Sequence, residues 1–215
     1  MGTIASRKNI QTYDVSEHAD AFDHSNMQVI EWVPAWLSRA ERLMIYSMTF
    51  CTRPLRYLEI GTFQGGSALL VSAALDALDS PGKMFCVDPE PRILPANWDK
   101  ISHRATLFTG FSPDILPDAY TAAEGHFDLV FIDGDHSYDG VVRDAEGVLP
   151  YVQEGSILLF HDCFFSDVAR GLDDFVQKHA ERVVDFGPIT REFTLQREEG
   201  RPDTSWGGLR MMQIR

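Results

Sequence analysis

The chain has 215 residues, a net charge of −13 and an isoelectric point near 4.8. Non-specific binding to nucleic acid or to an anionic membrane needs a basic face, so we expect this acidic chain to bind neither. Its apolar fraction of 44% and charged fraction of 24% are ordinary for a globular protein, and its length suits one α/β domain better than two.

The first 52 residues are predicted to form an arm followed by a helical cap. Residues 1–24 are polar, show no periodicity and lack the apolar core of a signal peptide. From residue 25 to residue 52, apolar side chains recur at steps of three and four, which is typical of a helix, and Pro34 predicts a break or kink. We expect this segment to cover a ligand site as a lid, or to be the surface through which two copies of the chain associate.

Cysteine usage and hydropathy together predict a cytoplasmic location. Cys51, Cys86 and Cys163 are scattered and form no Cys-x-x-Cys pair, so they indicate neither a disulfide framework nor a zinc site. A reducing compartment is the simplest interpretation. We also find no apolar stretch of the roughly 20 residues that a membrane span requires.

From residue 53 onward, short apolar runs alternate with helical patterns, which predicts a parallel sheet with helices on both faces. The predicted strands cover residues 56–60, 83–87, 106–109, 127–132 and 157–160. The predicted helices cover residues 68–78, 140–149 and 166–180, the last with Ser166 as its N-cap. Two further strand-like runs, 182–186 and 209–214, enclose a polar segment, 191–208, that we expect to be a long hairpin loop. The fold class is therefore α/β, a doubly wound sheet of about seven strands.

The most informative stretch follows the first predicted strand and reads Glu59-Ile60-Gly61-Thr62-Phe63-Gln64-Gly65-Gly66-Ser67. A strand, a glycine-rich turn and a helix start form a place where nucleotide-like ligands bind, because glycines admit close approach and the helix start offers free N–H groups. The turn fits neither the G-x-G-x-x-G pattern of dinucleotide-binding folds nor the G-x-x-x-G-x-G pattern of short-chain dehydrogenases, since Ser67 stands at the last glycine position.

Polar residues also gather where the other predicted strands end, and ligands of such sheets bind at the carboxyl ends of the strands. Asp88 follows the second strand, where an acidic side chain can accept the hydroxyls of a ribose. The ends of the third, fourth and fifth strands read Gly110-Phe111-Ser112, Asp133-Gly134-Asp135-His136 and His161-Asp162-Cys163. The preference of Asp, Gly and Ser for turns explains Asp135 well, but it explains His136, His161 and Asp162 poorly.

The pattern E-x-G-x-x-x-G-x-S resembles motif I of class I S-adenosylmethionine-dependent methyltransferases. The stretch 59–67 is similar to metal-dependent O-methyltransferases of the catechol type. The segments 131–138 and 161–163 are more similar to the bacterial branch with macrocin- and mycinamicin-type sugar O-methyltransferases and rhamnosyl and cephalosporin-type relatives. The resemblance covers about residues 50–215 and implies a Rossmann-like sheet in the order 3-2-1-4-5-7-6 with strand 7 antiparallel, in a domain spanning residues 53–215.

The resemblance also implies ligands and the residues that hold them. S-adenosylmethionine is expected at Glu59, Gly61, Thr62, Phe63, Gly65, Ser67, Asp88, Phe111, Ser112 and Asp133. Mg²⁺ or Mn²⁺ is expected at Asp133, His161 and Asp162, although related enzymes usually carry a carboxylate where His161 stands. From the residues alone, His161 is open to three roles: a ligand, a partner of a ligand, or a packed core residue.

The chemistry of methyl transfer suggests roles for the strand-end residues. A sugar hydroxyl is a weak acid, so its activation needs a base, a metal or both, in line with the sulfonium methyl. We expect His136 to be the general base, because an imidazole with a pKa near 6.5 suits proton abstraction at neutral pH. Asp133 is expected to take part in catalysis as a ligand of the ion that lowers the pKa of the hydroxyl. The alternative for His136 is a helix cap or a hydrogen bond to a carboxylate.

The expected function is an S-adenosylmethionine-dependent O-methyltransferase that acts on a hydroxylated small molecule, a sugar or a glycosylated natural product. Two alternatives come from other classes. One is a nicotinamide-dependent oxidoreductase on a similar sheet. The other is a non-catalytic or hydrolytic domain that binds a metal or a nucleotide.

Overall fold

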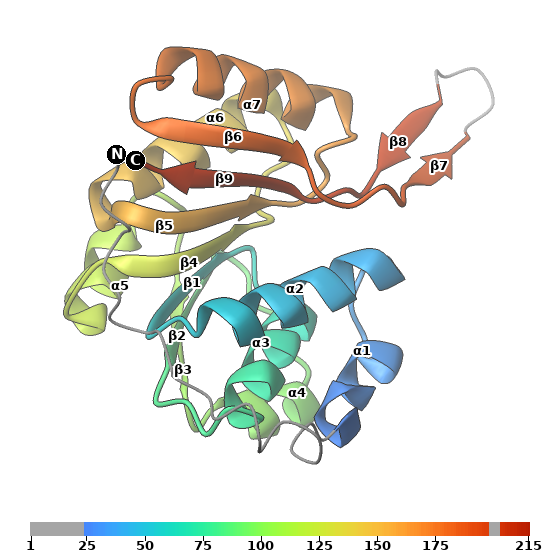
Figure 1. Ribbon diagram of the computed structural model, residues 1–215, viewed down its shortest axis with the longest axis vertical. Helices are drawn as coiled ribbons and strands as arrows, with labels where there is room; N and C mark the ends of the chain where they lie inside the picture. The colour runs from blue at the N-terminus through green and yellow to red at the C-terminus, as the bar shows by residue number, and fades with distance from the viewer. Residues whose placement is uncertain (1–23, 198–202) are drawn as a thin grey trace, which may run out of the picture.

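The apolar runs predicted as strands come together in one twisted sheet, seen in the computed structural model of Figure 1, which describes residues 24–197 and 203–215. The sheet has seven strands in the order β3-β2-β1-β4-β5-β9-β6. Their bounds are Arg56–Ile60 (β1), Lys83–Asp88 (β2), Ala105–Thr109 (β3), Phe127–Ile132 (β4), Val152–Phe160 (β5), Val183–Pro188 (β6) and Arg210–Ile214 (β9). Only β9 among these runs antiparallel to its neighbours, β5 and β6. The predicted strand order is therefore confirmed, with β9 as its seventh strand.

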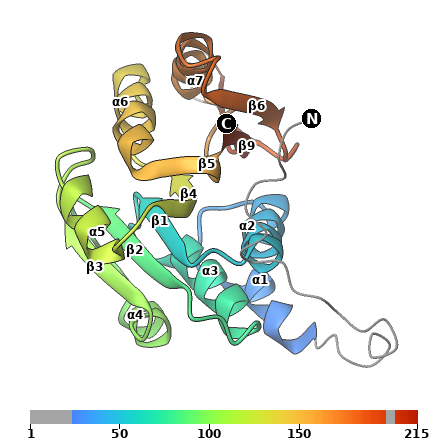
Figure 2. The same ribbon diagram turned by 60° about the vertical axis from the view of Figure 1, so that its left-hand side comes forward.

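Helices cover both faces of the sheet, as Figure 2 shows. One layer consists of α1 (Val29–Trp32), α2 (Arg39–Thr52), α3 (Gly66–Asp76) and α4 (Pro95–Ile101); the other consists of α5 (Leu116–Ala123), α6 (Tyr138–Val148) and α7 (Ser166–Lys178). Short 3-10 turns at His24–Gln28 and Leu149–Tyr151 precede α1 and follow α6. Each layer encloses its own apolar core, because successive side chains of a strand point to opposite faces. On β1, for example, Leu58 and Ile60 belong to one core and Tyr57 to the other.

The first helices follow the predicted pattern, with Pro34 in the break between α1 and α2. Ser38 begins α2 with a capping box: its hydroxyl accepts from the Glu41 N–H at 3.3 Å, and its own N–H donates to the Glu41 carboxylate at 2.6 Å. The expected arm lies mostly outside the described residues, since the description begins at residue 24. Among the described residues, no helix is both long and apolar enough to cross a membrane.

Two sequence-based predictions of local structure are wrong. Ser166 is the first helical residue of α7 rather than its N-cap; that position belongs to Phe165, whose side chain has no group that could cap the helix. The segment 191–208 is not simply a loop, because Thr194–Gln196 (β7) and Thr204–Trp206 (β8) pair as a separate antiparallel ribbon. This ribbon projects from the edge of the main sheet in Figure 1.

Candidate active site

A cavity of about 1360 Å³ opens at the carboxyl ends of the central strands. One wall comes from the turns after β1, β2 and β3 and contains Gly61, Phe63, Asp88, Phe111 and Ser112. The opposite wall comes from the linker before α2 and from the ribbon, and contains Trp36, Leu37, Ser38, Phe193, Thr194 and Trp206. Between the walls lie the strand-end residues Asp133, His136, His161 and Asp162. The volume exceeds that of a typical single-ligand pocket, so it offers room for two molecules side by side.

The glycine turn is built so tightly that Gly61 admits no side chain. Gly61 has φ +89°, and a Cβ on it would lie 2.0 Å from the backbone oxygen of Asp133. Its N–H donates to the carbonyl of Val87 at 2.8 Å. The turn therefore lies directly against the end of β4, which brings the expected cofactor side and the strand-end cluster together.

Asp88 supports this turn as well as lining the cavity. One of its carboxylate oxygens accepts the N–H of Phe63 at 2.7 Å, and the other accepts the N–H of Glu90 at 2.7 Å. Phe63 itself has φ +43°, an uncommon conformation for a bulky residue. The carboxylate thus holds the turn in this shape, and it keeps further acceptor capacity at the cavity that Asp88 lines.

Four residues predicted to contact the cofactor do not line the cavity: Glu59, Thr62, Gly65 and Ser67. Glu59 is completely buried and accepts a hydrogen bond from the hydroxyl of Tyr57 at 2.6 Å. Burial raises the pKa of Glu59 to about 8, so its carboxyl group is largely protonated at neutral pH. Gly65, with φ +78°, precedes α3 and lies against the side chains of α4. These residues support the turn from within the protein.

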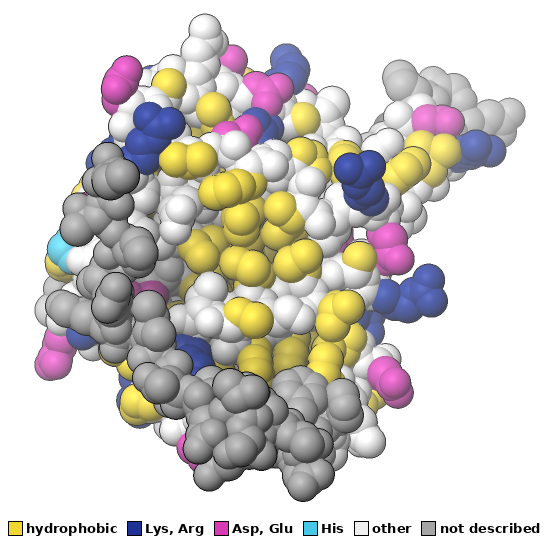
Figure 3. Space-filling view, in the orientation of Figure 1, with side chains coloured by type: hydrophobic (Ala, Val, Ile, Leu, Met, Phe, Trp, Pro, Cys, Tyr) yellow, Lys and Arg dark blue, Asp and Glu magenta, His cyan; other side chains and the backbone are white. Residues whose placement is uncertain are grey.

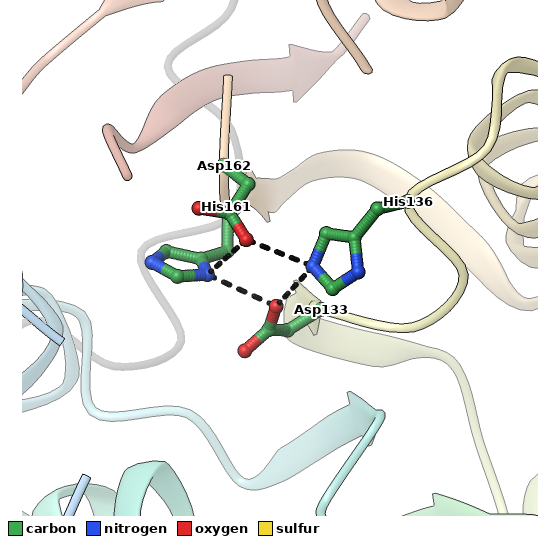
Figure 4. Close-up of side chains that lie close together, drawn as sticks. All are labelled: Asp133, His136, His161 and Asp162. Atoms are coloured by element: carbon green, nitrogen blue, oxygen red, sulfur yellow. Dashed lines mark hydrogen bonds and ion pairs between the residues drawn. The ribbon is translucent and has the colours of Figure 1, made fainter. Parts of the chain in front are cut away.

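The cluster forms because β4 and β5 are parallel neighbours, with Ile132 paired to Phe160 one residue before the site. Figure 4 shows two carboxylates and two imidazoles converging. Nδ1 of His161 lies 3.0 Å from Asp133 Oδ1 and 3.4 Å from Asp162 Oδ2. Nε2 of His136 lies 2.8 Å from Asp162 Oδ2 and 3.3 Å from Asp133 Oδ1. Asp162 reaches this position with φ +53°, a conformation that Asp tolerates better than most residues.

The four groups shift one another's protonation. Hydrogen bonds to Asp133 and Asp162 raise the pKa of His136 to about 9 despite its partial burial. For Asp162, burial alone would raise the pKa, but hydrogen bonds from His136 and His161 outweigh burial and lower it. Likewise, burial opposes the charged form of His161, yet the charge of Asp133 dominates and raises its pKa. As they stand, the residues form two ion pairs at neutral pH.

The same donor atoms suit a divalent cation. One ligand atom from each of Asp133, His136, His161 and Asp162 lies within 4.8 Å of the others. Carboxylate oxygens are the ligands of Mg²⁺ and Mn²⁺, whereas imidazole nitrogens favour transition metals, so the mixed set suits Mn²⁺ better than Mg²⁺. The predicted ligands Asp133, His161 and Asp162 are thus brought together, with His136 beside them.

Two buried acids of the site were not predicted to belong to it. Glu41, on α2, is 1% exposed and lies 3.5 Å from His161; its spacing from Ser38 in the sequence indicates only a capping box. Asp144, on α6, lines the cavity, and burial raises its pKa to about 6. In the sequence Asp144 reads as an ordinary polar residue of a surface helix, and no motif distinguishes it.

Comparison with known proteins finds similarity to methyltransferases. Residues 58–163, about half of the chain, match the family model of a methyltransferase domain. The match begins on β1 just before the glycine turn and ends just past His161 and Asp162. Uncharacterized protein R132 of Acanthamoeba polyphaga mimivirus is 33% identical over 120 residues, which are 53% of this chain and 54% of R132. The chain therefore spans about half the length of this curated relative.

Several solved structures share the fold at low sequence identity. The O-methyltransferase TomG of Streptomyces achromogenes, in complex with S-adenosylmethionine, has a TM-score of 0.62 at 17% identity, with 88% of this chain and 87% of TomG covered. An O-methyltransferase of Bacillus cereus, in complex with S-adenosylhomocysteine, has a TM-score of 0.61 at 18% identity and coverage of 94% and 95%. CalS11, a TDP-rhamnose 3'-O-methyltransferase, has a TM-score of 0.53 at 16% identity and coverage of 84% and 86%.

Proposed function

We propose that this chain is an S-adenosylmethionine-dependent O-methyltransferase that acts on a hydroxyl group of a small molecule. The observation that carries the proposal is one cavity that joins a glycine turn on one side to a cluster of two carboxylates and two imidazoles on the other. Such a cavity can hold the methyl donor and the acceptor next to a group that activates a hydroxyl. The methyltransferase-domain match and the fold support the same assignment.

On the cofactor side, the residues available to S-adenosylmethionine are Gly61, Phe63, Asp88, Phe111, Ser112 and Asp133. Asp88 is the group that accepts ribose hydroxyls, because only its carboxylate follows β2 in the cavity wall. Phe111 is 68% exposed and presents an aromatic ring for an adenine to stack on. The glycine turn keeps its shape through four residues that support it from within the protein and do not line the cavity: Glu59, Thr62, Gly65 and Ser67.

On the acceptor side, Asp133, His161 and Asp162 would hold a divalent ion, and such an ion would supply a Lewis acid that lowers the pKa of a hydroxyl. His136 acts as the base in its deprotonated form, which the positive charge of an ion would favour by opposing the rise of its pKa to about 9 that Asp133 and Asp162 cause. The side chain of His136 is 36% exposed, whereas that of His161 is 5% exposed, so an acceptor in the cavity can reach the first and not the second. Asp133 and Asp162 orient the ring of His136 through its Nε2.

The cavity wall formed by the linker before α2 and by the ribbon, which we call the acceptor wall, is rich in aromatic rings. Its Trp206 stacks on Phe165, a residue outside the cavity lining, with ring centroids 4.4 Å apart, and the ring of His136 meets Trp206 edge-on at 5.6 Å. Trp36 and Phe193, which complete this wall, are 85% and 58% exposed. Such a surface fits the apolar face of a ring next to the base, and we propose a sugar or a glycosylated natural product as the acceptor.

Calorimetric titration tests both halves of the site. We expect the wild-type protein to bind S-adenosylhomocysteine and, in its presence, Mn²⁺ or Mg²⁺. Asp162→Ala should keep the first affinity and lose the second, while the exposed control Asp139→Ala keeps both. Equal metal binding by Asp162→Ala would refute the metal assignment. Binding of NAD in place of S-adenosylhomocysteine would instead favour a nicotinamide-dependent oxidoreductase.

A further inference from the structure

Glu41 connects three distant parts of the chain at the back of His161. It lies on α2, is 1% exposed, and its carboxylate oxygen Oε2 is 3.5 Å from Nε2 of His161. In Figure 4 the Nδ1 atom of His161 points into the cluster and the Nε2 atom points the other way. Nε2 is buried and makes no hydrogen bond within the described part of the chain. Glu41 is thus the carboxylate on the side of the ring that the cluster does not occupy.

Two N–H donors and one imidazole face this carboxylate. The N–H of Ser38 donates to Oε2 at 2.6 Å, and the N–H of Gly208 donates to Oε1. Nε2 of His161 lies 3.5 Å from Oε2, at ion-pair distance. A carboxylate has only acceptor sites and so suits all three neighbours, whereas an amide would turn its own NH₂ group toward one of them.

The position of Glu41 decides which nitrogen of His161 keeps its proton. An acceptor next to Nε2 keeps a proton on that nitrogen, so Nδ1, which faces Asp133 and Asp162, is the nitrogen that would give up its proton to bind an ion. We infer that Glu41 is a positioning residue that fixes the orientation and tautomer of His161 for metal binding; this inference rests on the metal site of the proposed function. Partners of this kind typically change metal affinity 10–100-fold when they are removed.

The test is a Mn²⁺ titration of the full chain in the presence of S-adenosylhomocysteine, followed by electron paramagnetic resonance and calorimetry. Glu41→Gln keeps the size of the side chain and removes the acceptor-only character. Glu41→Asp keeps the charge and withdraws it from His161, and serves if the first variant does not fold. Thr49→Ala is the matched control, because it removes a buried hydrogen bond of 2.9 Å within the same helix and touches nothing in the site.

We expect 10–100-fold weaker Mn²⁺ binding in both Glu41 variants, with the affinity for S-adenosylhomocysteine alone unchanged within about twofold. Thr49→Ala should lower the melting temperature and leave the Mn²⁺ affinity as in the wild type. Unchanged Mn²⁺ affinity in the Glu41 variants, or an equal loss in Thr49→Ala, would overturn the inference and leave the proposed metal site standing. Absence of Mn²⁺ binding by the wild-type protein would overturn the metal site and this inference with it.

Discussion

Replacing Glu59 by Gln is expected to remove a pH dependence from the stability of the protein. The carboxyl group is completely buried, and burial raises its pKa from 4.5 to about 8. The folded state therefore holds this proton more tightly than the unfolded state does. Its contribution to the free energy of unfolding is fully present below about pH 4.5. It is lost as the pH rises toward 8, because the unfolded chain releases the proton and the folded chain does not. Such a pKa change corresponds to at most about 5 kcal/mol.

Urea unfolding of the wild type and of Glu59→Gln at several pH values between 5 and 8 measures this effect. Other titrating groups are common to both proteins, so the difference between their free energies of unfolding isolates Glu59. We expect the variant to gain stability relative to the wild type by several kcal/mol across this range. Glu154→Gln, at an exposed position, should show no such trend. Parallel pH profiles for the wild type and Glu59→Gln would refute the assignment of a buried, protonated carboxyl group.

Three further predictions concern the cavity. Gly61→Ala should lower the free energy of unfolding in urea by more than about 3 kcal/mol, because its Cβ would meet Asp133. Gly187→Ala, at φ +72° and in open space, should lower it only by the ~1–2 kcal/mol of backbone strain. Similar losses in the two variants would contradict the packing argument. His136→Ala should lower turnover by a factor on the order of 10²–10⁴ and leave the affinity for S-adenosylhomocysteine nearly unchanged in calorimetry; unchanged turnover would remove His136 as the base. Trp206→Ala should raise the KM for the acceptor with little change in cofactor affinity, and an effect on the cofactor alone would place the acceptor elsewhere.

The central sheet could be predicted from the sequence because its strands are buried on both faces. The run Phe127–Ile132 is almost wholly apolar, and its predicted bounds match β4. The short helices α4 and α5 were not predicted, since each begins with a proline in its first turn and has only seven or eight residues. The sequence predicts a loop in place of the ribbon because three-residue strands are too short to show alternation.

The site could be predicted as far as it depends on parallel strands. Because neighbouring strands end at one edge, the ends of β4 and β5 were expected to lie together, and the structure brings Asp133, His136, His161 and Asp162 within contact. Glu41 could not be found in this way. It comes from the first helical layer, and its contact with His161 depends on how α2 packs against the sheet, which no local pattern records.

Figure 3 shows hydrophobic side chains gathered in the middle of one face of the molecule, with the ribbon projecting to one side. Gly207 and Gly208 directly follow the ribbon, and their N–H groups donate to Asp162 and Glu41. Both glycines have positive φ, and a Cβ on Gly208 would lie 2.5 Å from the ring of Phe164. The root of the ribbon is thereby fixed to Asp162 and Glu41. Because this root is fixed, substitutions at Phe193, Thr194 or Gln196 can reshape the cavity wall without displacing Asp162 or Glu41.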